Sequence, residues 1–143
     1  MVENCNFSFF SKDISFTLKN QFKIKEWVLL SILKEGKTAG EISYIFCSDE
    51  YIYQINLEHL KHNTYTDIIT FNYCENNIIS GDIFISIDRV KENAITYNTT
   101  FQNELHRVII HGILHLIGFN DKTNEDKALM RSKEDFYLSL LSI

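Results

Sequence analysis

Several features that define whole classes of protein are missing from this 143-residue chain. It contains no proline, where average usage would give roughly seven residues, and we attach no functional meaning to this shortage. No apolar run approaches the roughly 18 residues that a transmembrane helix needs. The first residues also lack the charged segment and long apolar stretch of a signal peptide. We therefore expect a cytoplasmic protein with no membrane partner.

The cysteines are too few and too scattered to build a disulfide framework. Cys5, Cys47 and Cys74 form no Cys-x-x-Cys pair, so they are not typical of a cysteine zinc site. We expect them to pack as small hydrophobic residues in a reducing compartment. With 45% hydrophobic and 23% charged residues, the composition is that of an ordinary globular protein. The chain is long enough to bury a core as a single domain over residues 1–143.

An excess of positive charge is also missing. The formal net charge is −5 and the isoelectric point is near 5.5. A protein that coats nucleic acid without sequence preference needs a basic surface to displace counterions. The charge balance argues against that class, but it is compatible with a local basic cleft. DNA is not among the partners that we expect.

One compact motif dominates what is present, and it runs from His111 to Asp121. His111 and His115 are four residues apart, which places both rings on one face of a helix. Gly118 follows three residues later and can end that helix, so that the chain folds back and presents Asp121 to the same point. Two imidazoles and one carboxylate, with a fourth position left for water, form the ligand set of a catalytic zinc site. The motif predicts one Zn²⁺ per chain, or another divalent transition metal, held by these three side chains.

Such a site predicts hydrolysis. A zinc ion with three protein ligands lowers the pKa of its bound water from about 15.7 to about 7, and it polarises a carbonyl or phosphoryl oxygen. The metal-bound water is therefore the expected catalytic group, acting on an amide, an ester or a phosphodiester. Zinc peptidases carry a glutamate directly after the first histidine as general base, and this chain has Gly112 there. A metallopeptidase-like hydrolase is the less favoured alternative.

Hydrophobic periodicity predicts a mixture of strands and helices. Strands are expected over about 5–10, 41–47, 66–72 and 80–86. Helices are expected over about 20–33, 48–60, 86–97 and 123–141, with the motif helix running from Thr99 or Thr100 to Gly118. This order predicts an α+β fold, in which a small mixed β-sheet packs with helices around a central helix that bears the metal.

Taken together, these motifs closely resemble the YbeY family of bacterial metal-dependent endoribonucleases. Residues 111–121 match the family motif His-Gly-x-Leu-His-Leu-x-Gly-Tyr-Asp-His, with changes near its end. Residues 66–71 match its Thr-Asp-Val-Leu-Ser-Phe segment, and residues 81–86 match its Gly-Asp-Ile strand. Asn56 and Glu104 match two further family positions. The resemblance covers roughly residues 20–140 and implies an α+β fold built around the motif helix.

The resemblance also implies a function. It indicates a metal-dependent single-strand endoribonuclease that acts in ribosomal RNA maturation and ribosome quality control. The metal would activate water or assist cleavage through the 2′-hydroxyl, two routes that stay open at this point. Ribosomal RNA or ribosomal particles, together with ribosome-assembly proteins, would be the partners. The alternative from a different class is a non-catalytic ribosome-assembly factor whose metal is structural.

Three positions depart from the family pattern. Asp121 replaces a histidine, so we expect a weaker Lewis acid and a shift toward harder metals such as manganese. Leu60 replaces an arginine suited to phosphate contact. Arg107 replaces a histidine one turn before His111, and it is our candidate for the missing phosphate contact. An ion pair between Arg107 and Glu104 is the alternative interpretation.

Five further side chains are weaker candidates. Asp67 and Asp82 could orient the ligand imidazoles, or could simply form hydrogen bonds at strand ends. His59 and His62 could contact RNA, although a solvated helix end is the simpler interpretation. His106 is expected to be structural or exposed, because it faces away from the ligand pair.

Overall fold

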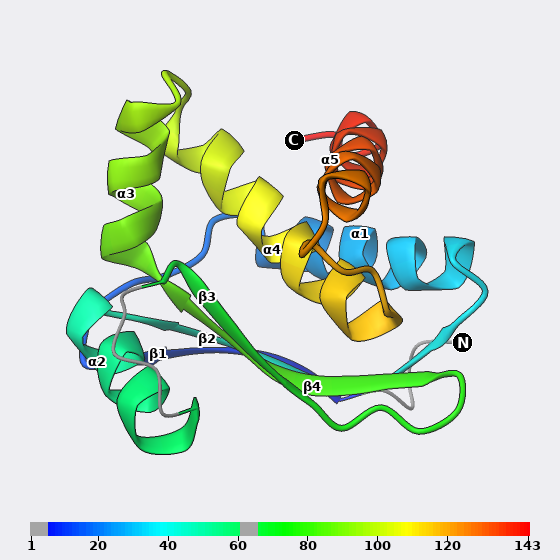
Figure 1. Cartoon of the computed structure of the whole chain (residues 1–143), viewed down its shortest axis with the longest axis horizontal. Helices are drawn as coiled ribbons and strands as arrows, with labels where there is room; N and C mark the ends of the chain where they lie inside the picture. The colour runs from blue at the N-terminus through cyan, green and yellow to red at the C-terminus, as the bar shows by residue number, and fades with distance from the viewer. Residues whose placement is uncertain (1–5, 61–65) are drawn as a thin grey trace.

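The structure, a computed structural model, describes residues 6–60 and 66–143 of the chain (Figure 1). Its strands are β1 (Asn6–Lys12), β2 (Thr38–Cys47), β3 (Ile68–Asn72) and β4 (Ile78–Ser86). Its helices are α1 (Gln21–Lys34), α2 (Asp49–Ile55), the π-helix η1 (Asn56–Leu60), α3 (Ile87–Thr96), α4 (Phe101–Ile117) and α5 (Asn124–Ser139). None of these described helices combines the length and the apolar character needed to cross a membrane.

The strands form one mixed sheet in the order β1-β2-β4-β3. β1 pairs with β2 and β2 pairs with β4 in parallel, whereas β3 is antiparallel to β4. Figure 1 shows α1, α3, α4 and α5 on one side of this sheet and α2 at one end of the other side. The prediction of an α+β fold with a small mixed sheet is therefore confirmed.

The predicted elements are confirmed with small shifts at their ends, and the caps explain several of these ends. Ser48, Ser86 and Thr100 each accept a hydrogen bond from a backbone N–H in the first turn of α2, α3 and α4. The exception is the helix expected over 48–60, because α2 ends at Ile55 and the chain then winds into a π-helix. Side-chain periodicity gives no signal for this wider winding.

Helix α4 lies in the centre of the core, as predicted for the helix with the motif. Its residues Leu105, Ile109, Ile110, Ile113 and Leu114 have no exposed surface. Below it, the Tyr44 hydroxyl on β2 donates a hydrogen bond of 2.7 Å to the Ile109 carbonyl. Burial raises the pKa of Tyr44 well above its ordinary value, so the phenol keeps its proton and stays a donor. The sheet therefore holds α4 through apolar contact and one buried polar anchor.

Helix α5 is attached to α1 by polar contacts at two points. The Trp27 indole donates a hydrogen bond of 2.7 Å to the Tyr137 carbonyl. Glu35, just past the end of α1, accepts hydrogen bonds from the Tyr137 hydroxyl and from Lys133, the latter at 2.9 Å. These contacts set the position of α5 over α4.

Replacement of Tyr44 by phenylalanine tests the buried anchor. We expect Tyr44→Phe to lower the free energy of unfolding by about 1 kcal/mol, because it removes one buried hydrogen bond and little apolar area. Urea unfolding at neutral pH measures this change. Tyr97→Phe is the control, since Tyr97 is 63% exposed and should change stability by less than about 0.5 kcal/mol. Equal effects of the two substitutions would contradict a special role for the anchor.

Glu35 should make stability depend on pH. Burial works to raise the pKa of Glu35, but the hydrogen bonds from Tyr137 and Lys133 and the charge of Lys133 outweigh it and hold the pKa below its ordinary value. A carboxyl with a lowered folded pKa stabilises the fold above its unfolded pKa of about 4.3. We expect this stabilisation to be lost as the pH falls through the lower folded pKa.

The comparison is between Glu35→Gln and wild type in urea unfolding from about pH 7 to about pH 3. The difference in stability between the two proteins should shrink as the pH falls. Glu26→Gln, at an exposed position of α1, is the matched control. A difference that does not vary with pH would refute the proposed role of the Glu35 carboxylate.

Candidate metal centre

The two histidines of the motif lie in the second half of α4, and the turn after the helix brings the third side chain to them. Gly118 ends α4 with φ 125°, a left-handed conformation that side chains rarely adopt. Its N–H lies 3.1 Å from the carbonyls of both Leu114 and His115. The chain then reverses, and Asp121 returns to the face of α4 that carries His111 and His115.

The three side chains meet closely enough to share one ion. Asp121 Oδ2 lies 3.5 Å from His111 Nε2 and 3.3 Å from His115 Nε2. One donor atom from each residue lies within 4.8 Å of the other two. Ligands at tetrahedral zinc distances are separated by about 3.3 Å, so these spacings fit a single ion of that kind. The structure thus brings the three predicted ligands together.

A carboxylate from α5 orients the first histidine. Glu134 Oε2 lies 2.6 Å from His111 Nδ1, and the Glu134 side chain is only 7% exposed. A carboxylate oxygen accepts a hydrogen bond from an N–H group, so this contact places the imidazole proton on Nδ1. The lone pair of Nε2 then faces Asp121 and His115. The arrangement prepares His111 to bind a metal through Nε2.

Arg107 holds the same carboxylate from its other side. Its Nη1 lies 2.8 Å from Glu134 Oε1, and its Nη2 lies 2.7 Å from Asp135 Oδ1. The ion pair considered with Glu104 is replaced by pairs with α5, because α5 packs across α4 at this turn. Both oxygens of Glu134 are therefore occupied, one by a guanidinium and one by an imidazole.

Charge within this network sets the protonation of its members. Burial works to raise the pKa of Glu134, but the hydrogen bonds and charges of His111 and Arg107 hold it below its ordinary value. Burial works to lower the pKa of His111, yet the hydrogen bond to Glu134 and the negative charges of Glu134, Asp121 and Asp67 raise it. Protons therefore compete for His111 at a higher pH than for an isolated histidine.

Comparison with known proteins agrees with this geometry. A family model described as endoribonuclease YbeY matches residues 6–142. The chain belongs to the YbeY family. The match confirms the predicted family, whose members are described as endoribonucleases and hence as hydrolases.

Individual YbeY relatives match over almost their whole length. The endoribonuclease YbeY of Flavobacterium johnsoniae is 48% identical over 134 residues, which cover 94% of this chain and 96% of the relative. The endoribonuclease YbeY of Cytophaga hutchinsonii is 50% identical over 133 residues, which cover 92% of this chain and 93% of the relative. The solution structure of TM1509 from Thermotoga maritima aligns with a TM-score of 0.66 and 27% identity, covering 93% of this chain and 87% of that one.

The setting of the YbeY motif explains the glycine after its first histidine. A Cβ atom on Gly112 would lie 2.9 Å from Ile83 Cγ2 and 3.0 Å from Ile68 Cδ1. Position 112 therefore faces the sheet at close range and leaves no room for a side chain. The general base of a zinc peptidase has no place here.

The two candidate aspartates differ in their position relative to the centre. Asp67, just before β3, is close enough for its charge to act on His111, and burial raises its own pKa despite the opposing charges of His111 and Arg89. Burial and the negative charge of Asp82 raise the pKa of Tyr73, so Asp82 lies close to Tyr73. Its neighbour Ile83 is buried in the core against α4, so Asp82 points to the opposite face of the sheet. It therefore cannot orient the ligand imidazoles.

The other two described histidines, His59 and His106, are not part of the ligand group. His106 is 8% exposed with its ring 6.4 Å from that of Trp27, and burial lowers its pKa. His59 is exposed, with the edge of its ring against Phe71. Leu60, at the position of the family arginine, is 39% exposed. His62 lies outside the described residues.

Glu134 is the residue of the candidate centre that the sequence analysis missed. It lies 23 residues beyond His111, in a charged run that resembles the solvated face of a helix. The buried residues of α5 are Met130, Glu134 and Tyr137, spaced as one helical face. A glutamate inside this apolar stripe was the available signal, because a buried carboxylate needs a partner.

Glu134→Gln tests the orienting contact. We expect metal affinity to fall by about 10- to 100-fold, because the amide is a weaker acceptor for the Nδ1 proton and no longer fixes the tautomer as strongly. Competition with a chromogenic zinc chelator measures the affinity. Asp135→Asn is the matched control, since Asp135 also pairs with Arg107 but does not contact His111. A loss of equal size in both variants would assign the effect to Arg107 and not to the contact between Glu134 and His111.

Proposed function

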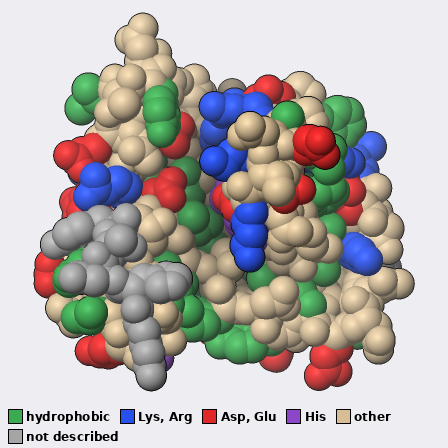
Figure 2. All heavy atoms as spheres, viewed as in Figure 1, with side chains coloured by type: hydrophobic (Ala, Val, Ile, Leu, Met, Phe, Trp, Pro, Cys, Tyr) green, Lys and Arg blue, Asp and Glu red, His purple; other side chains and the backbone are tan. Residues whose placement is uncertain are grey.

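We propose that this chain is a metal-dependent single-strand endoribonuclease that acts in ribosomal RNA maturation and ribosome quality control. The observation that carries the proposal is the group His111, His115 and Asp121, in a chain that the family model matches over residues 6–142. Ribosomal RNA or ribosomal particles are the proposed substrates, with ribosome-assembly proteins as further partners. Figure 2 shows histidine and carboxylate side chains inside a hollow, with Lys and Arg side chains along its rim.

We assign one ion per chain to His111, His115 and Asp121, with Zn²⁺ as the proposed metal. Two nitrogens and one oxygen suit zinc, and the carboxylate also suits harder divalent metals. When bound, the ion supplies Lewis acidity toward water and the phosphodiester. Glu134 keeps the His111 ring in place, and the turn at Gly118 delivers the carboxylate of Asp121.

Arg107 first serves to position Glu134 in this scheme. Its guanidinium is occupied by two carboxylates, and its side chain is 25% exposed. An RNA phosphate that approaches Arg107 competes with Asp135, whose side chain is 59% exposed, for Nη2. The phosphate contact predicted for Arg107 therefore requires that Asp135 is displaced. Charge-assisted hydrogen bonds from the guanidinium to the phosphate would offset the loss of the pair with Asp135.

Two alternative functions, a zinc peptidase and a ribosome-assembly factor, make different demands on the residues of the site. A zinc peptidase would need a base that position 112 cannot provide. A ribosome-assembly factor with a structural metal needs the same ligands but no reaction. Loss of the metal separates the two cases, since a structural ion stabilises the fold and a catalytic one need not.

Asp121→Ala is the decisive substitution. We expect purified wild-type protein to hold about one transition metal per chain by elemental mass spectrometry, and Asp121→Ala to hold much less while still folded. Cleavage of a single-stranded ribosomal RNA fragment should fall by at least about 100-fold in the variant. Asp121→His, which provides a neutral imidazole in place of the carboxylate, should restore metal binding.

The control is Glu125→Ala, at an exposed position in the first turn of α5. It should keep both the metal and the cleavage activity. A metal-loaded wild-type protein that cuts no RNA, alone or with ribosomal particles, would overturn the nuclease proposal. Unfolding of Asp121→Ala together with inactive wild type would support the assembly factor.

A further inference from the structure

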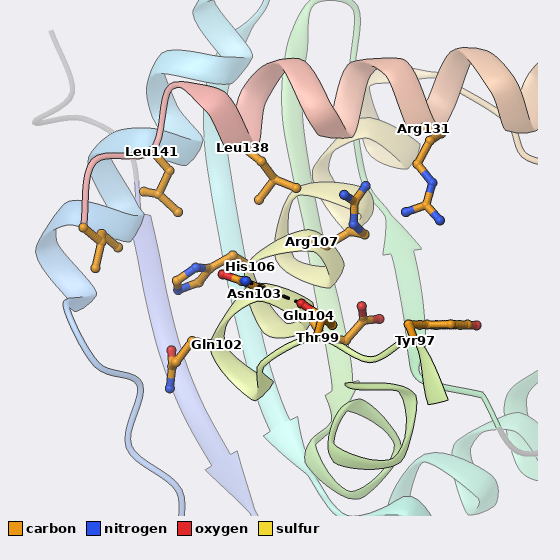
Figure 3. A pocket seen from close by; sticks show the side chains of 11 residues that line it. Tyr97, Thr99, Gln102, Asn103, Glu104, His106, Arg107, Arg131, Leu138 and Leu141 are labelled. Atoms are coloured by element: carbon orange, nitrogen blue, oxygen red, sulfur yellow. Dashed lines mark hydrogen bonds between the residues drawn. The ribbon is translucent and has the colours of Figure 1, made fainter. Parts of the chain in front are cut away.

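A cavity lies between the first half of α4 and the C-terminal part of the chain, and Arg107 of the candidate metal centre lines it (Figure 3). Its volume is about 580 Å³, within the range of small-molecule and nucleotide sites. Figure 3 shows Tyr97, Glu104, Arg107 and Arg131 toward one end of it, and Gln102, His106 and Leu141 toward the other. The first of these ends is the one with charged side chains.

Glu104 is a largely buried carboxylate with no hydrogen-bond partner for its side chain in the described part of the chain. The residue is 6% exposed and lines the cavity. Among the described residues, none forms a hydrogen bond or an ion pair with its side chain. Burial and the negative charge of Asp67 raise the pKa of Glu104, and the charges of Arg107 and Arg131 only partly oppose this. Neither side-chain oxygen of Glu104 is fully buried, so both are accessible from the cavity. A ligand with N–H donors in the cavity can therefore form hydrogen bonds to them.

The rim of this end carries an aromatic ring and a guanidinium, two kinds of group that bind nucleotides. Tyr97 is 63% exposed, so its ring is free to stack on a base. Arg131 is 62% exposed in its side chain, and its one ion pair among the described residues is at 3.9 Å to Glu134 Oε1. That distance is beyond a hydrogen bond, so its guanidinium has donors available for a phosphate.

The cavity and the metal centre lie along the same face of α4. Glu104 precedes His111 by seven residues, which is two turns of α4 and about 10 Å along the same helix face. Arg107 lies between them, lines the cavity and contacts Glu134, which contacts His111. A single strand that crosses the metal centre along α4 would bring a nearby base to Glu104.

We propose that this cavity is a nucleobase subsite, in which the Glu104 carboxylate reads the Watson–Crick edge of a guanine near the cleaved phosphodiester. The subsite rests on the proposed function, because it takes single-stranded RNA as the ligand. A carboxylate only accepts hydrogen bonds. Guanine presents two adjacent donors, the ring N–H and the exocyclic amino group, whereas adenine and cytosine set an acceptor beside their amino group. Glu104 is thus a specificity-determining residue, with Tyr97 stacking on the base and Arg131 contacting a backbone phosphate.

Binding of short oligonucleotides tests the subsite independently of cleavage. The probes are fluorescein-labelled, 2′-O-methylated uridine heptamers with guanosine at one position, moved through the sequence. Fluorescence anisotropy with the full, zinc-loaded chain gives the affinities, and the oligonucleotides are checked for integrity afterwards. We expect one or two positions where guanosine binds about tenfold tighter than adenosine, as for a hydrogen bond to a charged acceptor. Inosine, which lacks the amino group, should lose most of this preference.

Glu104→Gln tests the assignment from the protein side. The amide replaces one acceptor by a donor, so guanosine should bind about tenfold more weakly and adenosine should become the preferred base. Glu26→Gln, exposed on α1, should leave the preference unchanged. Should Glu104→Gln fail to fold, the inosine comparison still decides, because it alters only the RNA.

The outcomes separate the subsite from the nuclease activity. Affinity that is independent of the base at every position, or a guanosine preference that persists in folded Glu104→Gln, would overturn the subsite even if the chain cuts RNA. A guanosine preference that depends on Glu104, in a chain that cuts no RNA, would support the subsite and refute the nuclease.

Discussion

The buried carboxylate of Glu134 is the contact on which the candidate metal centre depends. It joins Arg107 and His111 of α4 to α5, with one oxygen for each. A carboxylate buried without such partners would destabilise the fold by about 3–5 kcal/mol. The same contact that lets α5 pack on α4 therefore also selects the tautomer and direction of a metal-binding imidazole. The contacts of Glu134 therefore contribute both to the stability of the fold and to the orientation of His111.

This coupling makes the position of α5 part of the site. Trp27 and Glu35 hold α5 from the side of α1, and Tyr44 holds α4 from the side of the sheet. The ligand group thus rests on a central helix that is fixed on both sides. Asp121 alone comes from a turn, and Gly118 sets the direction of that turn. A rigid helix with one side chain from a short turn brings the three donor atoms close to one another.

Helix α4 also organises the surface beyond the ligands. Glu104, Arg107, His111 and His115 follow one another along one side of the helix. In the proposed scheme, this side reads a base, positions a carboxylate and holds the ion, in that order. Arg131 on α5 places a further guanidinium near this side, with its Nη1 3.9 Å from Glu134 Oε1.

Local patterns in the sequence were sufficient for the elements and for the ligand group. Strands and helices followed from apolar periodicity and caps, and His111, His115 and Asp121 lie within eleven residues, so one helix and one turn bring them together. The family resemblance rested on the same local motifs. The π-helix at 56–60 was missed because its hydrogen bonding leaves no distinct side-chain pattern.

Only the tertiary structure decided which distant groups complete the site. Glu134 and Asp135 are far from Arg107 in sequence, and their pairing depends on how α5 crosses α4. Asp67 and Asp82 were alike as sequence candidates, yet the alternation of side chains across the sheet leaves Asp82 on the far face. The position of Glu104 in the wall of a cavity became visible only once its surroundings were known. Sequence determined which three side chains group together, because they are local; packing of separate elements determined their orientation, their charge and the cavity beside them.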